Sequence, residues 1–317
     1  MDDMQEAARA WRVGLIGYGE VGRIVAEDLR ALGLPHVLAW DRKLADGQGA
    51  ELREHARAHG IATAASAAEL AGSCELVLSA VTASQAVAVA LECAASLRAG
   101  CWFVDVNSAS PGAKTQAAQA VDGAGGRYVE AAVMTSVPPY RSKVPMLLGG
   151  AHAHALEPAL QALGFAGARF GDARLGVVSA TKMCRSVMIK GLEAMVIESF
   201  SAARAYGVED AVLASLAETF PGIDWERQGA YFFQRVIEHG RRRSEEMREV
   251  ARTVQEAGLE PWSAAGSAER QAWVADLAER GVFGRRGEPG FARTPDWRTE
   301  ADRMLAARPC ERDEDTD

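Results

Sequence analysis

Three glycines near the amino terminus have the spacing of a phosphate-binding loop. Residues 12–22 read R-V-G-L-I-G-Y-G-E-V-G, an apolar run followed by glycines that open a helical pattern. Gly17 permits a tight turn, Gly19 lets a pyrophosphate approach the backbone, and Gly22 lets the helix pack close to the strand. The helix N-terminus then offers its N–H groups to the phosphates. The predicted dinucleotide-binding residues of this loop are Gly17, Tyr18, Gly19, Glu20, Val21 and Gly22.

An acidic residue after the next apolar run bears on which dinucleotide is bound. Asp41 lies 24 residues beyond Gly17, where a carboxylate accepts hydrogen bonds from the adenosine ribose hydroxyls. That carboxylate repels a 2′-phosphate, whereas the adjacent Arg42 and Lys43 attract one. The sequence therefore favours NAD and leaves NADP open, with Asp41 and Arg42 both among the predicted cofactor-binding residues.

A lysine lies near the start of a long helical pattern. Residues 176–186 read G-V-V-S-A-T-K-M-C-R-S, and the spacing places Lys182, Arg185 and Ser186 on one helix face. A lysine at the head of a mainly apolar helix between two domains can donate a proton to a substrate oxygen or accept one from it. Lys182 is the catalytic candidate, and Arg185 and Ser186 are substrate-binding candidates. The competing interpretation is a solvated lysine at a helix end.

A third segment reads D-V-N-S-A-S-P over residues 105–111. It is similar to the D-x-S-T-x-S-P substrate segment of the β-hydroxyacid dehydrogenase family, which includes 3-hydroxyisobutyrate and 6-phosphogluconate dehydrogenases. The glycine loop and the lysine segment match the same family in the same order, so the chain resembles it over about residues 11–260. Lys182 falls on the family's catalytic lysine. The resemblance implies hydride exchange between a nicotinamide cofactor and a 3-hydroxy-carboxylate or related alcohol, assisted by this lysine.

The resemblance also implies roles for residues around the lysine. Ser108 would contact the substrate or the nicotinamide ribose, and Asn107 would support it, which makes Asn107 a candidate for both substrate binding and cofactor binding. A small-molecule carboxylate is the implied substrate. The end of the apolar run 75–81 would line the cofactor through Ala80, Val81 and Thr82.

Three segments depart from the family's pattern, and the third has Glu245-Glu246 where the family often has Lys-Asp. Residues 134–140 read M-T-S-V-P-P-Y where the family has a small S-G-G loop, and the family's K-x-x-N-N becomes K-x-x-R-S over residues 182–186. Thr135 and Ser136 are therefore predicted to contact substrate in place of that loop. A bulkier loop and an added arginine suggest a larger or more anionic substrate. The changes resemble a subgroup with an uncharacterised helical C-terminal domain.

The elements that must position these residues follow from the apolar pattern. Residues 1–172 alternate apolar runs with Ala- and Leu-rich helical patterns, which is typical of an α/β doubly wound (Rossmann) domain. The predicted strands are residues 12–16, 36–40, 75–81, 102–106, 128–133 and 146–148, and the predicted crossover helices are residues 21–32, 66–70 and 85–97.

The rest of the chain predicts an all-α domain for substrate binding and dimerisation over residues 173–300. It begins with a long interdomain helix. An isolated helical half led by such a helix would leave apolar faces uncovered, so we expect a homodimer. Residues 301–317 are predicted to be a disordered acidic tail. The predicted helices are residues 177–206, 209–219, 227–238, 244–257 and 268–280.

Composition excludes several other classes of protein. The chain has 317 residues, of which 48% are hydrophobic, and a formal net charge of −8, which disfavours nucleic-acid binding. No apolar run reaches the length of a membrane span. Five scattered cysteines without a C-x-x-C pair are typical of a reducing compartment. A cytoplasmic protein that binds neither nucleic acid nor membrane is expected.

Histidines supply two further hypotheses. His55 and His59 have a metal-like spacing, but the sequence shows no third ligand, so a solvated helix face is expected and no metal is predicted. His239 precedes the cluster Arg241–Arg243 and is a candidate substrate contact, its alternative being a helix C-terminal cation. One of the three arginines is an alternative anion contact.

Two other functions remain open at this point. Imine reductases share the two-domain plan but usually have Asp or Tyr in place of the lysine, so Lys182 argues against that activity. A cofactor-binding protein without catalysis is the second alternative, and the presence of both Lys182 and Ser108 argues against it.

Overall fold

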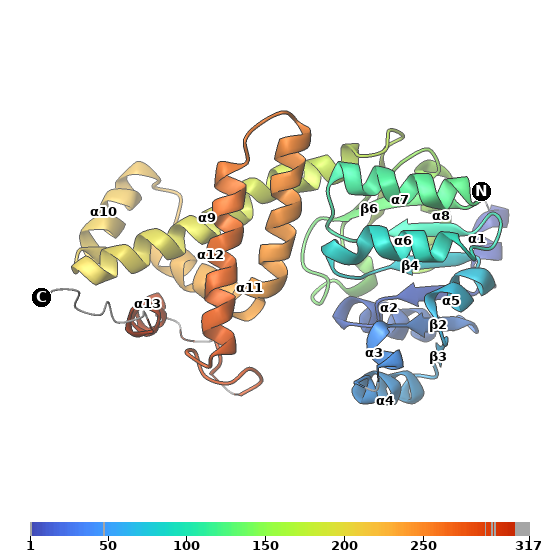
Figure 1. The fold of residues 1–317 in the computed structure, drawn as a ribbon, viewed down its shortest axis with the longest axis horizontal. Coiled ribbons are helices and arrows are strands. Elements are labelled where there is room, and N and C mark those ends of the chain that lie inside the picture. Colours follow the sequence, from blue (N-terminus) through green and yellow to red (C-terminus); the bar gives the residue numbers. More distant parts are fainter. Residues whose placement is uncertain (1, 47, 289, 293, 295, 308–317) are drawn as a thin grey trace, which may run out of the picture. The chain divides into compact units, whose positions relative to one another are not determined.

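The protein is described by a computed structural model that covers residues 2–46, 48–288, 290–292, 294 and 296–307. It divides into two units. The first comprises Met1–Cys184 and Arg252–Leu259, and the second comprises Arg185–Ala251 and Glu260–Asp317. Two long helices, α9 (Val177–Tyr206) and α11 (Trp225–Glu256), contribute residues to both units (Figure 1).

The first unit is built on one sheet. Its strands are β1 (Val13–Ile16), β2 (Val37–Trp40), β3 (Ala62–Thr63), β4 (Leu76–Ser79), β5 (Trp102–Asp105), β6 (Arg127–Val133), β7 (Met146–Gly149) and β8 (Ala168–Asp172). The strand order is β3-β2-β1-β4-β5-β6-β7-β8. Strands β1 to β6 are parallel, β7 pairs antiparallel with β6, and β8 pairs parallel with β7. The chain order reverses between β1 and β4, which is the switch point where doubly wound folds bind their ligands.

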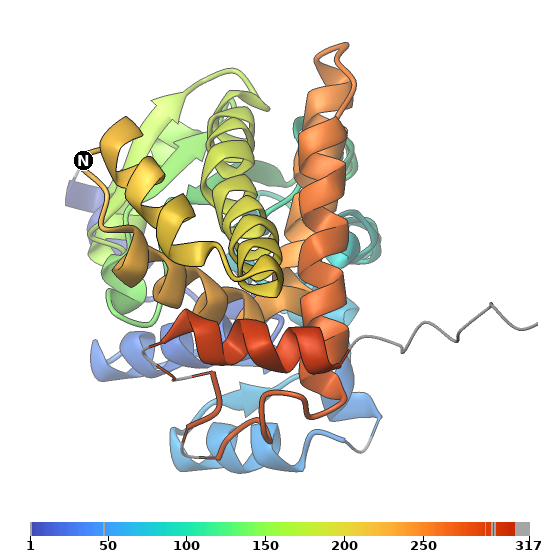
Figure 2. The same ribbon diagram turned by 90° about the vertical axis from the view of Figure 1, so that its left-hand side faces the viewer.

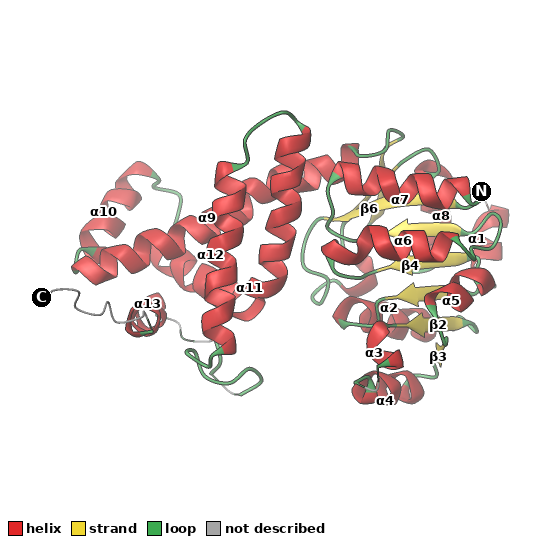
Figure 3. Cartoon of the chain, viewed as in Figure 1, coloured by secondary structure: helices red, strands yellow, loops and turns green. Residues whose placement is uncertain are grey.

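Helices cover both faces of this sheet, as the predicted fold class requires (Figure 3). On β1, Leu15 packs into one core and Ile16 into the other. Val25 and Leu29 of α2 join the first core, and Leu70 of α5 joins the second. The helices of this unit are α1 (Asp2–Ala8), α2 (Glu20–Ala31), α3 (Arg42–Ala45), α4 (Ala50–Ala58), α5 (Ala67–Ser73), α6 (Ala86–Ala94), α7 (Pro111–Gly123) and α8 (Ala153–Ala162), with 3₁₀ turns η1 (Ala83–Gln85) and η2 (Arg141–Lys143).

All six predicted strands are present, but the sequence pattern missed β3 and β8. Both residues of β3 are exposed, and β8 exposes three of its five residues. Neither strand contains an apolar run, because each lies at an edge of the sheet and buries few side chains. Edge strands of this kind are recognised through their partners rather than through their own sequence.

The second unit is helical, and one prediction about it is wrong. Its other helices are α10 (Glu209–Thr219), α12 (Trp262–Glu279) and α13 (Trp297–Ala306). The two helices predicted at residues 227–238 and 244–257 are the single helix α11. A Cβ atom at Gly240 would lie 2.8 Å from the carbonyl oxygen of Gln271 in α12. Gly240 therefore allows a close approach of two helices instead of ending one of them.

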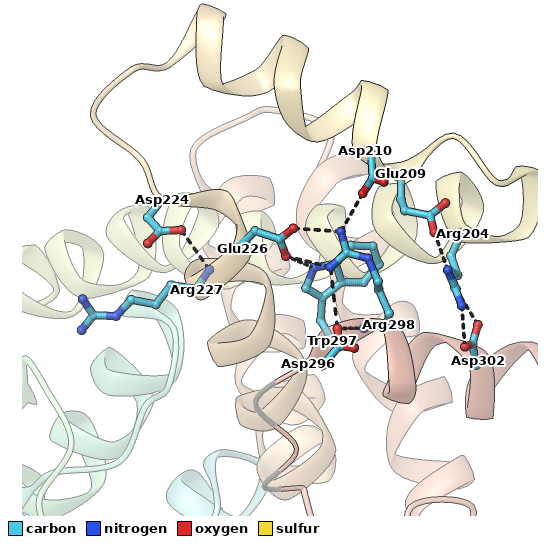
Figure 4. Close-up of polar contacts among 10 residues, drawn as sticks. All are labelled: Arg204, Glu209, Asp210, Asp224, Glu226, Arg227, Asp296, Trp297, Arg298 and Asp302. Atoms are coloured by element: carbon cyan, nitrogen blue, oxygen red, sulfur yellow. Dashed lines mark hydrogen bonds and ion pairs between the residues drawn. The ribbon is translucent and has the colours of Figure 1, made fainter.

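The predicted disorder over residues 301–317 is also wrong in its first part, because α13 continues to Ala306 (Figure 2). Trp297 and Met304 are each 1% exposed and pack in the core of the second unit. The Arg298 guanidinium donates to Glu226 at 2.8 Å and to Asp210 at 2.9 Å (Figure 4). Apolar burial and ion pairs thus stabilise α13, although its polar sequence did not indicate a helix. Residues 308–317 lie outside the described part of the chain.

Among the described residues, every helix is too short or too polar to cross a bilayer.

Candidate dinucleotide and catalytic site

The glycine loop has the backbone geometry that its sequence predicts. Gly17 has a φ of +89°, and a Cβ atom there would lie 2.3 Å from the carbonyl oxygen of Ala80. A Cβ atom at Gly22 would lie 2.1 Å from the carbonyl oxygen of Gly17. At Gly19, by contrast, an added Cβ would meet no atom within 4 Å. Helix α2 begins at Glu20 without a side-chain cap, so its first N–H groups face that open space. The loop fits a pyrophosphate.

Asp41 lies at the end of β2 beside this loop. Its Oδ2 atom accepts a hydrogen bond from the Tyr18 backbone N–H at 2.9 Å, and its Oδ1 atom accepts one from the Lys43 N–H at 2.9 Å. A carboxylate has further lone pairs, and the half-buried Asp41 keeps some for ribose hydroxyls. The adjacent Arg42 side chain is exposed. The arrangement fits the adenosine end of a dinucleotide and leaves the choice between NAD and NADP to the balance of these charges.

Asn107 connects the ends of two neighbouring strands. Its Oδ1 atom accepts a hydrogen bond from the Val81 N–H at 2.7 Å, and its Nδ2 atom donates to Ser79 Oγ at 3.0 Å. Asn107 is 5% exposed. These two hydrogen bonds hold β4 and the predicted cofactor-lining segment after it, Ala80–Thr82, against the segment that follows β5.

A buried ion pair behind Asn107 was missed by sequence reasoning. Lys114 of α7 lies 2.9 Å from Asp105 Oδ1 and donates to the carbonyl oxygen of Asn107 at 2.7 Å. The Tyr128 hydroxyl donates to Asp105 Oδ2 at 2.7 Å, and burial raises the pKa of this tyrosine well above its ordinary value. The three side chains are at most 2% exposed. These contacts fix the backbone at Asn107, and Ser108 is the residue that follows it.

Two predicted site residues from distant segments meet in the first unit. The Lys182 ammonium donates to Ser108 Oγ at 2.7 Å. Ser108 follows the carboxyl end of β5, and Lys182 lies in the second turn of α9. The pair therefore lies at the edge of the sheet where doubly wound folds bind ligands.

The start of α9 is capped by a residue that the sequence did not single out. Glu130 of β6 is 1% exposed and accepts hydrogen bonds from the Gly176 N–H at 2.8 Å and the Ser179 N–H at 3.3 Å. A carboxylate at this end also complements the helix dipole. Glu130 thus fixes the end of α9 that carries Lys182. Glu256 does the same for α7, since it accepts from Ser110 Oγ at 2.8 Å and from the Gly112 N–H at 2.9 Å.

Replacing Glu130 with alanine is expected to lower the free energy of unfolding by about 1–3 kcal/mol, because buried N–H groups at the start of α9 lose their acceptor. Chemical denaturation followed by circular dichroism measures this change. Glu92→Ala, at an exposed carboxylate of α6, is the matched control and should leave the unfolding midpoint unchanged. Equal midpoints for the Glu130 variant and the control would contradict the capping role.

The other predicted substrate-binding residues lie elsewhere. Thr135 and Ser136 are exposed and follow β6. Arg185, which is exposed, and Ser186, which is buried, belong with His239 to the second unit. Burial and the nearby Arg242 lower the pKa of His239 to about 4. The alternative interpretation of His239 as a helix C-terminal cation is wrong, because it is neutral at pH 7 and α11 continues past it.

The cluster Arg241–Arg243 is not one solvated face. Arg241 pairs with Asp276 at 2.5 Å, and Arg242 pairs with Glu246 at 2.8 Å. Arg243 is 5% exposed and pairs with the buried Glu193 of α9. Glu246 also contacts Lys190 at 2.5 Å, and burial lowers the pKa of that lysine. Lys190 and Glu193 of α9 and Arg243 and Glu246 of α11 thus form a buried polar group that the sequence pattern did not reveal, whereas Arg241 and Arg242 stay partly exposed.

The glycine loop, the acidic residue after β2 and the strand order define a dinucleotide-binding domain. Residues 12–174 match the NAD binding domain of 6-phosphogluconate dehydrogenase, which is more than half of the chain. The chain therefore belongs to this family, as the sequence resemblance predicted. Residues 203–274 match a domain of unknown function, DUF1932. This second match confirms the predicted subgroup with an uncharacterised C-terminal domain.

Solved structures of similar fold include three examples. A conserved hypothetical protein from Sinorhizobium meliloti is 33% identical, with 93% of this chain and 96% of that chain covered and a TM-score of 0.71. A Mycobacterium tuberculosis 3-hydroxyisobutyrate dehydrogenase with L-serine is 17% identical, with 95% and 100% covered and a TM-score of 0.64. A Streptomyces aurantiacus imine reductase is 19% identical, with 93% and 99% covered and a TM-score of 0.52. The last two share the fold.

Proposed function

We propose that the protein is an NAD(P)-dependent oxidoreductase that interconverts a 3-hydroxy-carboxylate, or a related alcohol, and its carbonyl form. The observation that carries this proposal is the contact of 2.7 Å between the Lys182 ammonium and Ser108 Oγ. It joins a proton donor to a hydroxyl at the ligand-binding edge of a dinucleotide fold.

Each group of predicted site residues has a distinct role in the proposed reaction. The loop Gly17–Gly22 holds the pyrophosphate, Asp41 holds the adenosine ribose, and Ala80–Thr82 line the cofactor. A bound nicotinamide supplies the hydride acceptor or donor. Lys182 donates a proton to the substrate oxygen during carbonyl reduction and accepts it during alcohol oxidation, while Ser108 orients that oxygen by a hydrogen bond. Asn107 acts through the backbone that it fixes.

The binding of substrate is assigned to polar side chains. Thr135 and Ser136 contact the substrate from the loop after β6. Arg185, Ser186 and His239 of the helical unit are substrate-binding candidates from the sequence. The bulky loop and the added arginine favour a carboxylate larger or more anionic than a simple hydroxy acid.

Imine reduction on the same fold is the second candidate, favoured by the shared fold alone. Lys182 argues against it because those enzymes usually have Asp or Tyr at this position. A cofactor-binding protein without catalysis is the third candidate.

One assay series separates the three candidates. Formation of reduced cofactor is measured with a panel of 3-hydroxy acids, and its consumption with semialdehydes and cyclic imines, using NAD and NADP in parallel. Turnover of a hydroxy acid or its carbonyl supports the proposal. Turnover of cyclic imines alone would overturn the proposal in favour of imine reduction. Cofactor binding without any turnover would overturn it in favour of a cofactor-binding protein without catalysis.

We also propose that the protein is a homodimer through its helical unit. Met188 and Met195 of α9 are 69% and 60% exposed, and Tyr206 at the end of that helix is 83% exposed. A second copy that covers these apolar side chains removes them from water. Light scattering at micromolar concentration is expected to give the mass of two chains. The mass of a single chain would overturn this part of the proposal.

A further inference from the structure

The histidines His55 and His59, for which the sequence showed no third metal ligand, lie close to a carboxylate in the fold. Glu27 of α2, His55 of α4 and His59 at the end of α4 each place a potential ligand atom within 4.8 Å of the others. His55 Nε2 lies 2.9 Å from Glu27 Oε1, and the rings of His55 and His59 stack with centroids 4.3 Å apart. The expectation of a solvated helix face is wrong for His55, whose side chain is only 15% exposed.

A second contact links the same two helices beside this group. Arg23 of α2 pairs with Glu51 of α4 at 2.7 Å, one helical turn before Glu27 and His55. The pair of Glu27 with His55 is the next link between α2 and α4. Two successive links of this kind place the carboxylate of one helix beside the histidines that follow on the other.

Each of the three side chains is oriented by a further partner. His59 Nδ1 donates to the backbone carbonyl of His55 at 3.0 Å, which leaves the lone pair on its Nε2 atom. His55 Nδ1 lies 2.9 Å from the Tyr18 hydroxyl, which leaves Nε2 directed at Glu27. Arg141 holds the outer Glu27 oxygen at 2.7 Å. Outer partners of this kind are characteristic of metal-binding histidines and carboxylates.

The charge state suits a cation. Burial alone would raise the pKa of Glu27, but hydrogen bonds from Arg141 and His55 hold it below its ordinary value. Glu27 is therefore a carboxylate at pH 7. Two imidazole nitrogens and one carboxylate oxygen are a ligand set that zinc accepts, and a water molecule completes its tetrahedron. Atoms bound to one zinc ion lie about 3.4 Å apart, given bonds of about 2.1 Å. In the structure one pair of ligand atoms is 2.9 Å apart and all three lie within 4.8 Å of one another, a range that includes this distance.

We propose that Glu27, His55 and His59 bind a divalent transition-metal ion of the zinc class, separate from the site of Lys182. Binding needs no net proton release. The His55 Nε2 proton, now donated to Glu27, leaves as the ion binds, and Nδ1 takes up a proton and donates to the Tyr18 oxygen. The hydrogen bond between His55 and Tyr18 is thereby reversed. Tyr18 belongs to the glycine loop, so its side chain connects that loop with the proposed site.

The test is a calorimetric titration of the metal-free full-length protein with zinc chloride, after alkylation of accessible thiols to remove the contribution of Cys184. Wild type is expected to bind one ion per chain. His59→Ala removes an exposed ligand, leaves the core intact, and should weaken binding by on the order of 10–100-fold. His36→Ala, at an exposed histidine before β2, should bind zinc like wild type.

A second measurement identifies the ligands. Cobalt substituted into wild type should give the visible absorption of a tetrahedral ion, and Glu27→Gln should weaken that absorption. Absence of zinc binding by wild type, or equal affinity in the His59 and His36 variants, would overturn the proposal. Neither result depends on cofactor, substrate or turnover, so failure here is distinct from failure of the proposed oxidoreductase activity.

Discussion

Replacing Lys182 with alanine is expected to lower kcat by about 10²–10⁴-fold, the range for loss of a positioned proton donor. The ammonium lies 2.7 Å from Ser108 Oγ and is carried by the end of α9 that Glu130 caps. Cofactor affinity should change little, because the groups that fit the dinucleotide belong to other segments. The measurements are kcat with the substrate found in the assay panel and the cofactor Kd from fluorescence quenching.

Two further variants make this prediction specific. Lys182→Arg should not restore turnover, since a guanidinium stays protonated over the accessible pH range and cannot accept the proton back. Thr181→Ala changes the exposed neighbour on the same helix turn and should retain kcat. Near-normal turnover of Lys182→Ala would make the lysine structural and the proposed mechanism wrong.

Much of the fold could be predicted because its signals are local. Central strands such as β4 bury every residue, so they are visible as apolar runs, and the glycine loop is constrained by its own backbone. The long helix α9 and the following α10 have the ends that their patterns predicted. In each case the residues that define the element are adjacent in the chain.

The parts that could not be predicted depend on partners far away in the sequence. Glu130 accepts a hydrogen bond from Gly176, 46 residues later and directly before α9, and Glu256 contacts the backbone of a residue 144 positions earlier. His55 finds Glu27 only because α2 and α4 lie side by side in the fold. The sequence does not show which carboxylate caps a helix or pairs with a distant histidine, because the same residue type on a surface would be solvated.

The same reasoning explains the errors in the helical unit. Gly240 lies within a polar stretch and resembles a helix end, but its lack of a side chain permits contact with α12. A glycine inside a helix costs about 1 kcal/mol relative to alanine, which close packing offsets. In α13, one buried tryptophan and an arginine with two carboxylate partners outweigh a composition that predicts disorder.

Replacing Asp41 with asparagine is expected to shift cofactor preference toward NADP by on the order of 10–100-fold in the ratio of kcat/KM values. In wild type, the carboxylate repels a 2′-phosphate and accepts hydrogen bonds from the ribose hydroxyls of NAD. Asparagine loses that charge, while its amide oxygen still accepts from one of the two N–H groups, of Tyr18 and Lys43, that Asp41 now contacts. The exposed Arg42 is then available to the phosphate.

The ratio is measured for wild type and variant at matched ionic strength, because screening by salt weakens contacts with the phosphate. Asp46→Asn removes a neighbouring exposed carboxylate at the end of α3 and should leave the ratio unchanged, which separates the specific contact from the general field of the surface. An unchanged thermal midpoint shows that the glycine loop survives the loss of one hydrogen bond. A wild type that already prefers NADP would contradict the prediction. The attraction of Arg42 and Lys43 for the 2′-phosphate would then exceed its repulsion by the Asp41 carboxylate.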